Sequence, residues 1–338
     1  MASAQVRDVA ARAGVSPATV SNALNHPEKV SAATLKRVQV AIEELDYVRN
    51  DAARQLRQQR NRAVGMIVMD SSNPFFTGVA QGAEDTLAEL GRPMLLGNTD
   101  QDTARELTHL QLFEEQRLAG ILISPVGNVL ARLRKVAARG TAVVIVDRKA
   151  GTDEFSSVSV DDTLGGRLAA EHLLQLGRRR IAVIGGPGTI RQVAHRYGGA
   201  KTAVERSELN GTALVEFFDT GAMNIEAGRR GVQELLSRPV SSRPDAVFAT
   251  NDLVALGALQ QLTRSGVTVP EDIALIGYDD IEFAASATVP ISSIAQPTAD
   301  MGRRAAQLLQ TAIENPEAPV EHVVFTPSLV ARESTLGE

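Results

Sequence analysis

The stretch VRDVAARAGVSPATVSNALN, residues 6–25, decides the fold of the first part of the chain. Its apolar residues recur at the spacing of a helix that buries one face. Gly14 suits the left-handed conformation that ends a helix, while Ser16 and Pro17 suit the cap and the first position of the next helix. The stretch therefore predicts two short helices around a tight turn. A helix-turn-helix, whose second helix enters the DNA major groove, and a plain helical hairpin fit this spacing equally well.

The whole chain is large enough for several domains. It has 338 residues, of which 43% are hydrophobic, so two or three domains with sizeable cores are expected. No run of about 18 apolar residues occurs, and the first residues lack the apolar core of a signal peptide. The sequence contains no cysteine, which excludes disulfides and thiolate metal sites. We therefore expect a cytoplasmic protein without a membrane partner.

Charge is distributed unevenly along the chain. Residues 1–62 contain ten Arg or Lys and six Asp or Glu, whereas the remaining 276 residues contain 25 and 34. The first part therefore carries a net charge of +4 and the rest a net charge of −9. A basic N-terminal part on an acidic body suits a part that contacts phosphates.

The residues after the helical hairpin extend the N-terminal domain. Apolar residues at helical spacing predict a third helix over residues 31–45, with Ser31 as its cap. We expect a helix-turn-helix domain over residues 1–46 and a linker over residues 47–62. The linker is polar and basic, and a lone helix of about eight residues would be unstable in water. It is therefore expected to be disordered away from DNA.

These segments resemble the headpiece of the LacI/GalR family of bacterial transcription regulators. The resemblance rests on VRDVAARAGVSPATVSNALN, VSAATLKRV, AIEELDY and NDAARQL, in that order and spacing. It implies that the linker folds into a hinge helix on DNA. Leu56, with Ala53 beside it, matches the leucine that wedges into the minor groove and helps to kink the duplex. Arg49 is a departure, because the family usually has proline before Asn50.

The resemblance also assigns roles within the second helix. Pro17, Ala18 and Asn22 match the positions that face base edges, and only Asn22 can hydrogen-bond there, bidentately to adenine. Hydroxyl side chains next to them are candidates for phosphate contacts. The predicted DNA-binding residues are Ser16, Pro17, Ala18, Thr19, Ser21, Asn22, Asn25, Ala53 and Leu56.

The rest of the chain predicts two parallel sheets covered by helices. Short apolar runs alternate with helical segments such as 103–117 and 254–266. Runs of this kind, buried on both faces, are typical of parallel strands, and two such series predict two doubly wound lobes. The predicted strands are 64–70, 93–99, 120–125 and 142–148, then 180–186, 214–219, 245–252 and 273–280.

The predicted fold class is therefore α/β, with two doubly wound parallel-sheet lobes behind an all-α helix-turn-helix domain. The body covers residues 63–338. Its N-lobe is expected over about 63–160 plus 292–325, and its C-lobe over about 161–291. The segment 293–338 is expected to return to the N-lobe and complete it.

Polar side chains gather where the predicted strands end. Ligands of doubly wound sheets bind beyond the carboxyl ends of the strands. Carboxylates and amides bind hydroxyls, arginine donates paired hydrogen bonds, and aromatic faces cover CH groups, so this set is typical of a sugar site. Each residue also has a structural alternative. Phe75 and Phe76 could be core residues, and Asp252, beside Asn251, is expected to cap the helix that begins near Leu253.

The body is similar to the periplasmic-binding-protein type I fold that LacI-type regulators carry. The matching segments are NPFF, VDR, DDTLGG, RYGG, ATNDLVALGAL, IALIGYDD and SIAQP. Resemblance to ribose-binding relatives implies a sugar between the lobes, and Met223 departs from the stacking phenylalanine of those relatives. The residues implied to line this site are Asn73, Phe75, Phe76, Asp147, Arg148, Arg196, Met223, Asn251, Asp279 and Gln296. Ribose is the expected effector, and a purine, a nucleoside or a phosphorylated sugar is the alternative.

Other classes of function find little support in the sequence. No GxGxxG follows the first strand, no GxSxG occurs, and the five histidines are scattered, so no catalytic residue, metal or cofactor is predicted. A sugar-binding protein without a DNA function would not need the basic N-terminal domain. The resemblance implies a homodimeric regulator, usually a repressor, on a pseudo-palindromic operator in double-stranded DNA. No long leucine-rich tail follows Leu336, so the tetramerising heptad of some relatives is not expected, and the sequence leaves the choice between dimer and tetramer open.

Overall fold

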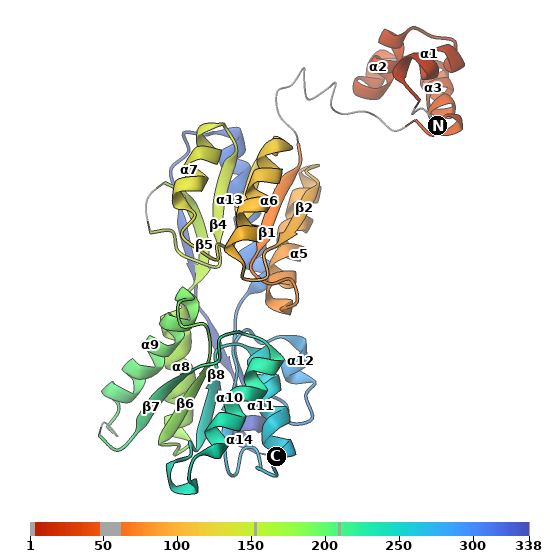
Figure 1. Cartoon of the computed structure of the whole chain (residues 1–338). Helices are drawn as coiled ribbons and strands as arrows, with labels where there is room; N and C mark the ends of the chain where they lie inside the picture. The colour runs from red at the N-terminus through yellow and green to blue at the C-terminus, as the bar shows by residue number, and fades with distance from the viewer. Residues whose placement is uncertain (1–3, 48–61, 152–153, 209–210, 338) are drawn as a thin grey trace. The chain divides into compact units, whose positions relative to one another are not determined.

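The computed structural model describes residues 4–47, 62–151, 154–208 and 211–337 (Figure 1). The chain forms two compact units, residues 1–60 and residues 61–338. The predicted hinge residues Ala53 and Leu56 lie outside the described residues. No helix within the described parts of the chain is long and apolar enough to cross a membrane.

The N-terminal unit is a small helical domain with a helix-turn-helix, as the opening stretch predicts. Its helices are α1 (Val6–Ala13), α2 (Pro17–Asn25) and α3 (Ala32–Glu44), with the 3-10 turn η1 (Pro27–Lys29) between the last two. Gly14 ends α1 in the left-handed conformation, at φ 64°. The Ser16 side chain caps α2 by accepting a hydrogen bond from the Thr19 N–H at 3.1 Å. The small core contains Val9, Ala10, Ala13, Val20, Ala23, Val38, Ala41 and Tyr47.

The second unit contains the two predicted parallel-sheet lobes. Within the described residues, the N-lobe sheet has six parallel strands in the order β11-β5-β4-β3-β1-β2. Helices α5 and α13 cover one face of this sheet, and α6 and α7 cover the other (Figure 1). The strands are β1 (Val64–Val68), β2 (Met94–Asn98), β3 (Gly120–Ile123), β4 (Ala142–Val146), β5 (Ser156–Val160) and β11 (His322–Phe325). The helices are α5 (Pro74–Glu89), α6 (Thr103–Glu115), α7 (Leu130–Ala138) and α13 (Thr298–Glu314).

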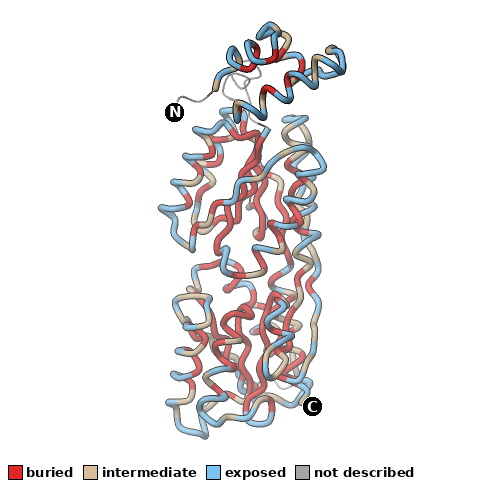
Figure 2. Tube along the Cα trace, turned by 90° about the vertical axis from the view of Figure 1, so that its right-hand side faces the viewer, coloured by how far each residue is buried: buried red, intermediate tan, exposed pale blue. Residues whose placement is uncertain are grey.

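The C-lobe repeats this architecture on a smaller scale. Its described strands form a parallel sheet in the order β7-β6-β8-β9, with α8 and α9 on one face and α10 and α11 on the other. Buried residues follow the strands of both lobes, as the red parts of the tube show (Figure 2). The strands are β6 (Arg180–Gly185), β7 (Leu214–Asp219), β8 (Ala246–Ala249) and β9 (Ala274–Ile276). The helices are α8 (Asp162–Gln175), α9 (Arg191–Arg206), α10 (Ile225–Ser237), α11 (Asp252–Arg264) and the short α12 (Glu282–Ala285), while η2 (Val240–Ser242) is a 3-10 turn.

The C-terminal segment divides between the two lobes, which corrects the prediction that residues 293–338 complete the N-lobe. Helix α13 and β11 do join the N-lobe. Strand β10 (Ser293–Ala295) instead lies beside the end of β9 and pairs with β12 (Ser328–Val330). Helix α14 (Glu333–Leu336) also packs against β9, so all three elements belong to the C-lobe. The reason is that β9 is an edge strand, and the Ser334 hydroxyl donates to the Leu275 carbonyl there at 2.6 Å.

The helices that cover each sheet approach one another at glycines. A Cβ on Gly166 of α8 would lie 1.9 Å from the Arg196 carbonyl oxygen, and one on Gly199 of α9 would lie 2.0 Å from the Thr163 carbonyl oxygen. Neither position has room for a methyl group, because both contacts are with backbone. The same close approach joins α5 to α13 and α10 to α11; the glycines there are Gly82, Gly302, Gly228 and Gly257.

We predict that Gly199→Ala lowers the free energy of unfolding by about 1–3 kcal/mol, because the added methyl group forces α8 and α9 apart. Gly198→Ala is the matched control, since a Cβ on the neighbouring Gly198 meets nothing within 4 Å. The control should stay within about 1 kcal/mol of the wild type. Urea denaturation followed by circular dichroism measures both changes. Equal stability of the two variants would contradict this account of the helix contact.

Candidate functional site

Polar residues of both lobes meet at the carboxyl ends of the two sheets. A small cavity there, with a free volume of about 20 Å³, has room for roughly one water molecule. Eight of the ten residues predicted to bind a sugar line this cavity. The lining residues are Met69, Asn73, Phe75, Phe76, Asp147, Ile190, Gln192, Arg196, Met223, Asn251 and Asp279.

Arg196 is the buried centre of the site. Its Nε donates to Asp162 Oδ1 at 2.8 Å and its Nη1 donates to the Thr250 carbonyl at 2.6 Å. The guanidinium also lies 3.6 Å from the centre of the Tyr278 ring. Nη1 also lies 3.8 Å from Asp279 Oδ1, within ion-pair distance, and Arg196 lines the cavity. A buried charge needs such partners, because an unpaired one would be too costly to desolvate.

Asp279 collects side chains from distant parts of the chain. Its carboxylate accepts from Asn73 Nδ2 at 3.1 Å and from Gln296 Nε2 at 2.8 Å. Gln296 thereby reaches the site without lining the cavity itself. Burial raises the pKa of Asp279 to about 6, and the nearby charge of Arg196 opposes this increase. Asp279 adopts φ 104°, a backbone conformation that aspartate and asparagine tolerate better than most residues.

Asp147 is the corresponding acid of the N-lobe, directly after β4. Gln192 Nε2 donates to both its backbone carbonyl and its Oδ2, each at 2.8 Å. Its other oxygen, Oδ1, is buried and has no hydrogen-bond partner within the described residues. Burial, with repulsion from Asp162, raises the pKa of Asp147 to about 8. The carboxyl group is therefore mostly neutral at pH 7.

Two of these contacts join the lobes directly. Asn73 of the N-lobe bonds to Asp279 of the C-lobe, and Gln192 of the C-lobe bonds to Asp147 of the N-lobe. The same amides and carboxylates are the groups that bind sugar hydroxyls. A ligand between the lobes would therefore exchange these cross-lobe hydrogen bonds for its own.

Aromatic rings form the apolar wall of the cavity. Phe75 and Phe76 follow Asn73, which caps α5 by accepting from the Phe75 N–H at 3.0 Å. Their rings lie edge to face with centres 5.0 Å apart. Met223 also lines the cavity, at the position where the resemblance led us to expect a phenylalanine. The Met223 carbonyl accepts a hydrogen bond from Asn251 Nδ2 at 3.1 Å.

The prediction that Asp252 caps the helix after β8 was wrong. Asn251 is the cap of α11, and its Oδ1 accepts from the Val254 N–H at 2.9 Å. Asp252 is instead buried and accepts hydrogen bonds from the Ile281 N–H and the Ser293 hydroxyl. Both residue types cap helices well, so the sequence alone did not separate them.

Three polar residues at the site escaped the sequence analysis: Asp162, Gln192 and Tyr278. Asp162 was visible as the second acid of DDTLGG, at the start of α8. Gln192 and Tyr278 carried no local signal, since a glutamine in a first helical turn and a tyrosine after a strand are commonplace. Arg148 was predicted for the cavity but lines a neighbouring pocket, where its Nη1 lies 3.4 Å from the Gly127 carbonyl.

The predicted DNA-reading residues share one side of α2. Pro17, Ala18 and Asn22 are exposed, whereas Val20 and Ala23 are buried in the helical core. The remaining polar residues of the helix bond locally; Ser16 bonds to Thr19 at 2.9 Å, and Asn25 donates to the Ser21 carbonyl at 2.8 Å. No cluster of metal-ligating side chains occurs among the residues that the structure describes.

Comparison with known proteins decides the family. Residues 5–50 match the model of bacterial regulatory proteins of the lacI family, and residues 170–335 match a periplasmic binding protein-like domain. The chain is 33% identical over 335 residues to the ribose operon repressor of Bacillus subtilis, and the match covers 99% of each chain. The chain belongs to the LacI family.

The names of two further relatives in the LacI family point to different ligands. The HTH-type transcriptional repressor PurR of Aliivibrio fischeri is 32% identical over 336 residues, covering 99% of each chain. A solved LacI family transcriptional regulator from Enterococcus faecium, with bound ribose, is 28% identical, with a TM-score of 0.72 over 82% of this chain and 99% of that one. The similarity to the LacI family thus covers both the N-terminal domain and the body of the chain.

We predict that the stability of Asp147→Asn rises relative to the wild type as pH increases from 5 to 8. The unfolded wild type loses the Asp147 proton near pH 4, whereas the folded state keeps it up to its pKa of about 8. Folded wild type therefore binds more protons in this range and loses stability as pH rises, by up to about 1 kcal/mol per unit. Asparagine cannot titrate.

The measurement is urea denaturation at several pH values, with exposed Asp85→Asn as the control. The control should run parallel to the wild type over the whole range. Parallel curves for Asp147→Asn and the wild type would show that Asp147 is ionised in the folded protein.

Proposed function

We propose that this member of the LacI family is a transcriptional repressor that binds operator DNA and responds to a monosaccharide, ribose, bound between the lobes. The observation that carries this proposal is the convergence of Arg196, Asp279 and Asn73 on one buried cavity beside the Phe75–Phe76 wall. This combination offers hydrogen-bond donors, acceptors and an apolar face within one small space. Its function is regulatory, and no step of catalysis is assigned to it.

Sugar chemistry accounts for the types of residue present. A ring hydroxyl can donate to Asp279, and it can accept from Arg196. The CH faces of a furanose or pyranose ring can lie against Phe75 and Phe76. The names of the Bacillus subtilis repressor and the ribose-bound regulator favour ribose among the sugars. The name PurR keeps a purine as the second candidate, and planar stacking against the phenylalanines would serve it.

The active form is proposed to be a cytoplasmic homodimer on a pseudo-palindromic operator, since paired helix-turn-helix domains read paired half-sites. Strand β2 is an edge strand, and its Leu95 and Leu96 are 46% and 52% exposed. Exposed leucines on an open edge favour pairing with a second copy. Sugar binding would change the relation of the lobes and hence operator affinity; a coupling of about 1–3 kcal/mol corresponds to roughly 5–150-fold.

Calorimetric titration of the full chain tests the proposal. The titrants are ribose, other pentoses and hexoses, and hypoxanthine. Ribose should bind more tightly than the other sugars, and it should change the affinity of the protein for its operator, once DNA selection has identified that site. Binding of hypoxanthine without binding of any sugar would overturn the choice of ribose.

We predict that Asp279→Asn weakens ribose binding on the order of 10- to 100-fold, because a charge-assisted hydrogen bond to the ligand is lost. Asparagine tolerates the positive φ of this position. Asp280→Asn is the matched control, because Asp280 does not line the cavity and instead forms an ion pair with Arg332, with 2.6 Å between the charged atoms. Undiminished ribose affinity in Asp279→Asn would remove this residue from the site.

We predict that Asn22→Ala costs about 1–3 kcal/mol of specific DNA affinity and relaxes the preference for one base pair in each half-site. Asn22 is exposed on α2, so its removal should leave the fold intact. Selection of binding sites from a random DNA pool compares the variant with the wild type. An unchanged consensus would mean that Asn22 does not read a base.

A further inference from the structure

A second, larger pocket lies next to the cavity, on the side where β5 leads into α8. We call it the hinge-side pocket; its volume is about 570 Å³, within the range of small-molecule sites. Asp147 and Gln192 line both spaces, so this hydrogen-bonded pair forms their common wall. The other lining residues that bear on its chemistry are Arg148, Lys149, Asp161, Asp162, Arg191 and His195.

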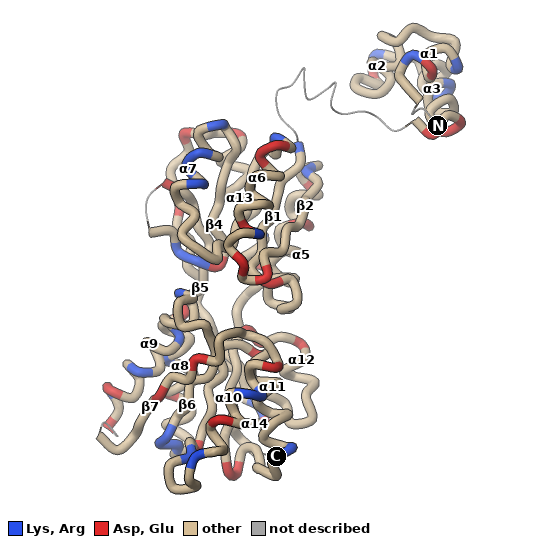
Figure 3. Tube along the Cα trace, in the orientation of Figure 1, with Lys and Arg blue, Asp and Glu red and all other residues tan. Residues whose placement is uncertain are grey.

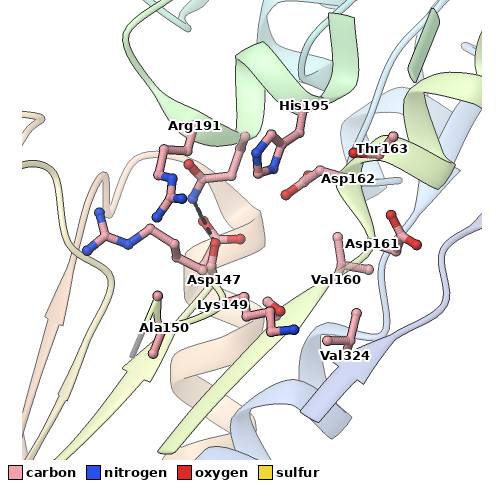
Figure 4. Close-up of a pocket in the computed structure, with 14 residues that line it drawn as sticks. Asp147, Lys149, Ala150, Val160, Asp161, Asp162, Thr163, Arg191, His195 and Val324 are labelled. Carbon is pink, nitrogen blue, oxygen red and sulfur yellow. Dashed lines mark hydrogen bonds between the residues drawn. The ribbon is translucent and has the colours of Figure 1, made fainter. Parts of the chain in front are cut away.

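Three basic side chains of the two lobes line this pocket. Arg148 and Lys149 follow β4 in the N-lobe, and Arg191 begins α9 in the C-lobe; Figure 4 shows Lys149 and Arg191 among the lining side chains. Arg148 Nε is buried without a hydrogen-bond partner within the described residues. Burial and then the nearby charge of Arg191 lower the pKa of Arg148, while Glu106 and Asp147 oppose this decrease. An anion between Arg148 and Arg191 would relieve that repulsion.

Lys149 and Arg191 are free of ion pairs within residues 62–151, 154–208 and 211–337. Other arginines of the two lobes are engaged by acids, for example Arg134 by Glu154 and Arg304 by Glu321. Figure 3 shows basic and acidic residues scattered over both lobes. The cations of the hinge-side pocket are therefore available to an external anion.

The backbone adds further donors at the same place. Helix α9 runs for 16 residues and starts in the pocket, and its N-cap residue Ile190 offers no side-chain acceptor. The first N–H groups of a helix, together with its dipole, favour an anion. His195, one turn later, also lines the pocket and points into the same region as Arg191 (Figure 4).

The acids of the pocket have contacts of their own within the protein. Asp162 is engaged by Arg196 at 2.8 Å, and Asp161 caps α8 by accepting from the Leu164 N–H at 2.9 Å. Asp147, whose pKa is raised to about 8 by burial, is mostly protonated at pH 7. Its unpartnered Oδ1 is then able to donate a hydrogen bond to an anionic oxygen rather than repel it.

We propose that the hinge-side pocket binds a phosphate group, either as inorganic phosphate or as the monoester of a small metabolite. Arg148 and Lys149 hold it from the N-lobe and Arg191 with the start of α9 holds it from the C-lobe. A bound phosphate would therefore link the two lobes near the point where the chain crosses from β5 of the N-lobe to α8 of the C-lobe. This site shares only the wall formed by Asp147 and Gln192 with the proposed sugar contacts, and the proposal does not rest on the identity of the ligand in the cavity.

The test is calorimetry of the full chain at low ionic strength with ribose, inorganic phosphate and ribose 5-phosphate as separate titrants. Arg191→Gln and Lys149→Gln should each weaken binding of the phosphate-bearing titrants roughly 10-fold or more, as expected for lost charge-assisted hydrogen bonds. Arg206→Gln is the matched control, because Arg206 is an exposed arginine at the other end of the same helix. Ribose affinity should change little in all three variants.

The titrants also distinguish the source of the phosphate. Binding of inorganic phosphate together with ribose indicates two ligands, whereas binding of ribose 5-phosphate alone, sensitive to Arg191→Gln, indicates one ligand that spans both spaces. The proposal is overturned if neither phosphate-bearing titrant binds more tightly than ribose, or if Arg191→Gln and Arg206→Gln behave alike. Loss of ribose binding with phosphate binding retained would contradict the proposed sugar effector and leave this site standing.

Discussion

The buried charge of Arg196 is the constraint on which the ligand site depends. Its guanidinium cannot be neutralised at ordinary pH, so the surrounding chain must supply partners wherever it lies. Asp162 at the start of α8, the Thr250 carbonyl after β8 and the Tyr278 ring after β9 provide them. One side chain thus fixes three strand or helix ends against each other. Removing one partner of such a buried pair typically costs 3–5 kcal/mol.

The close packing of α8 and α9 is what delivers Arg196 to that position. Gly166 of α8 lies directly against the Arg196 backbone of α9. Because Gly166 has no side chain, α9 can approach α8 closely enough to place the Arg196 guanidinium in the buried site. The Gly199 contact with Thr163 holds the same pair one turn further along. The motifs DDTLGG and RYGG therefore carry packing information as much as ligand contacts. This dual role explains why both glycines and charged residues occur together in them.

Much of the fold could be predicted from the sequence, because β1, β3 and β4 are continuous apolar runs that only a doubly buried strand explains. Strand β5, SSVSV, was missed because its serines disguise a strand that is buried from Ser157 to Val160. The Ser157 hydroxyl accepts from the Ala150 N–H and bonds to His322 Nδ1 at 2.8 Å. The site followed from the rule that ligands lie at strand ends. Gln192 escaped because its role depends on Asp147, 45 positions earlier, which no local pattern records.

The wall between the cavity and the hinge-side pocket has consequences for regulation. Gln192 uses its amide N–H groups on Asp147, and Asp147 holds one further oxygen without a partner. A ligand that takes a hydrogen bond from either residue changes what the other can offer on the opposite side. Occupancy of one space must therefore alter the affinity of the other, and thermodynamic linkage makes this coupling equal in both directions. Asp147 belongs to the N-lobe and Gln192 to the C-lobe, so this coupling would change the relative orientation of the two lobes. In the proposed mechanism, that change of orientation is what alters operator affinity.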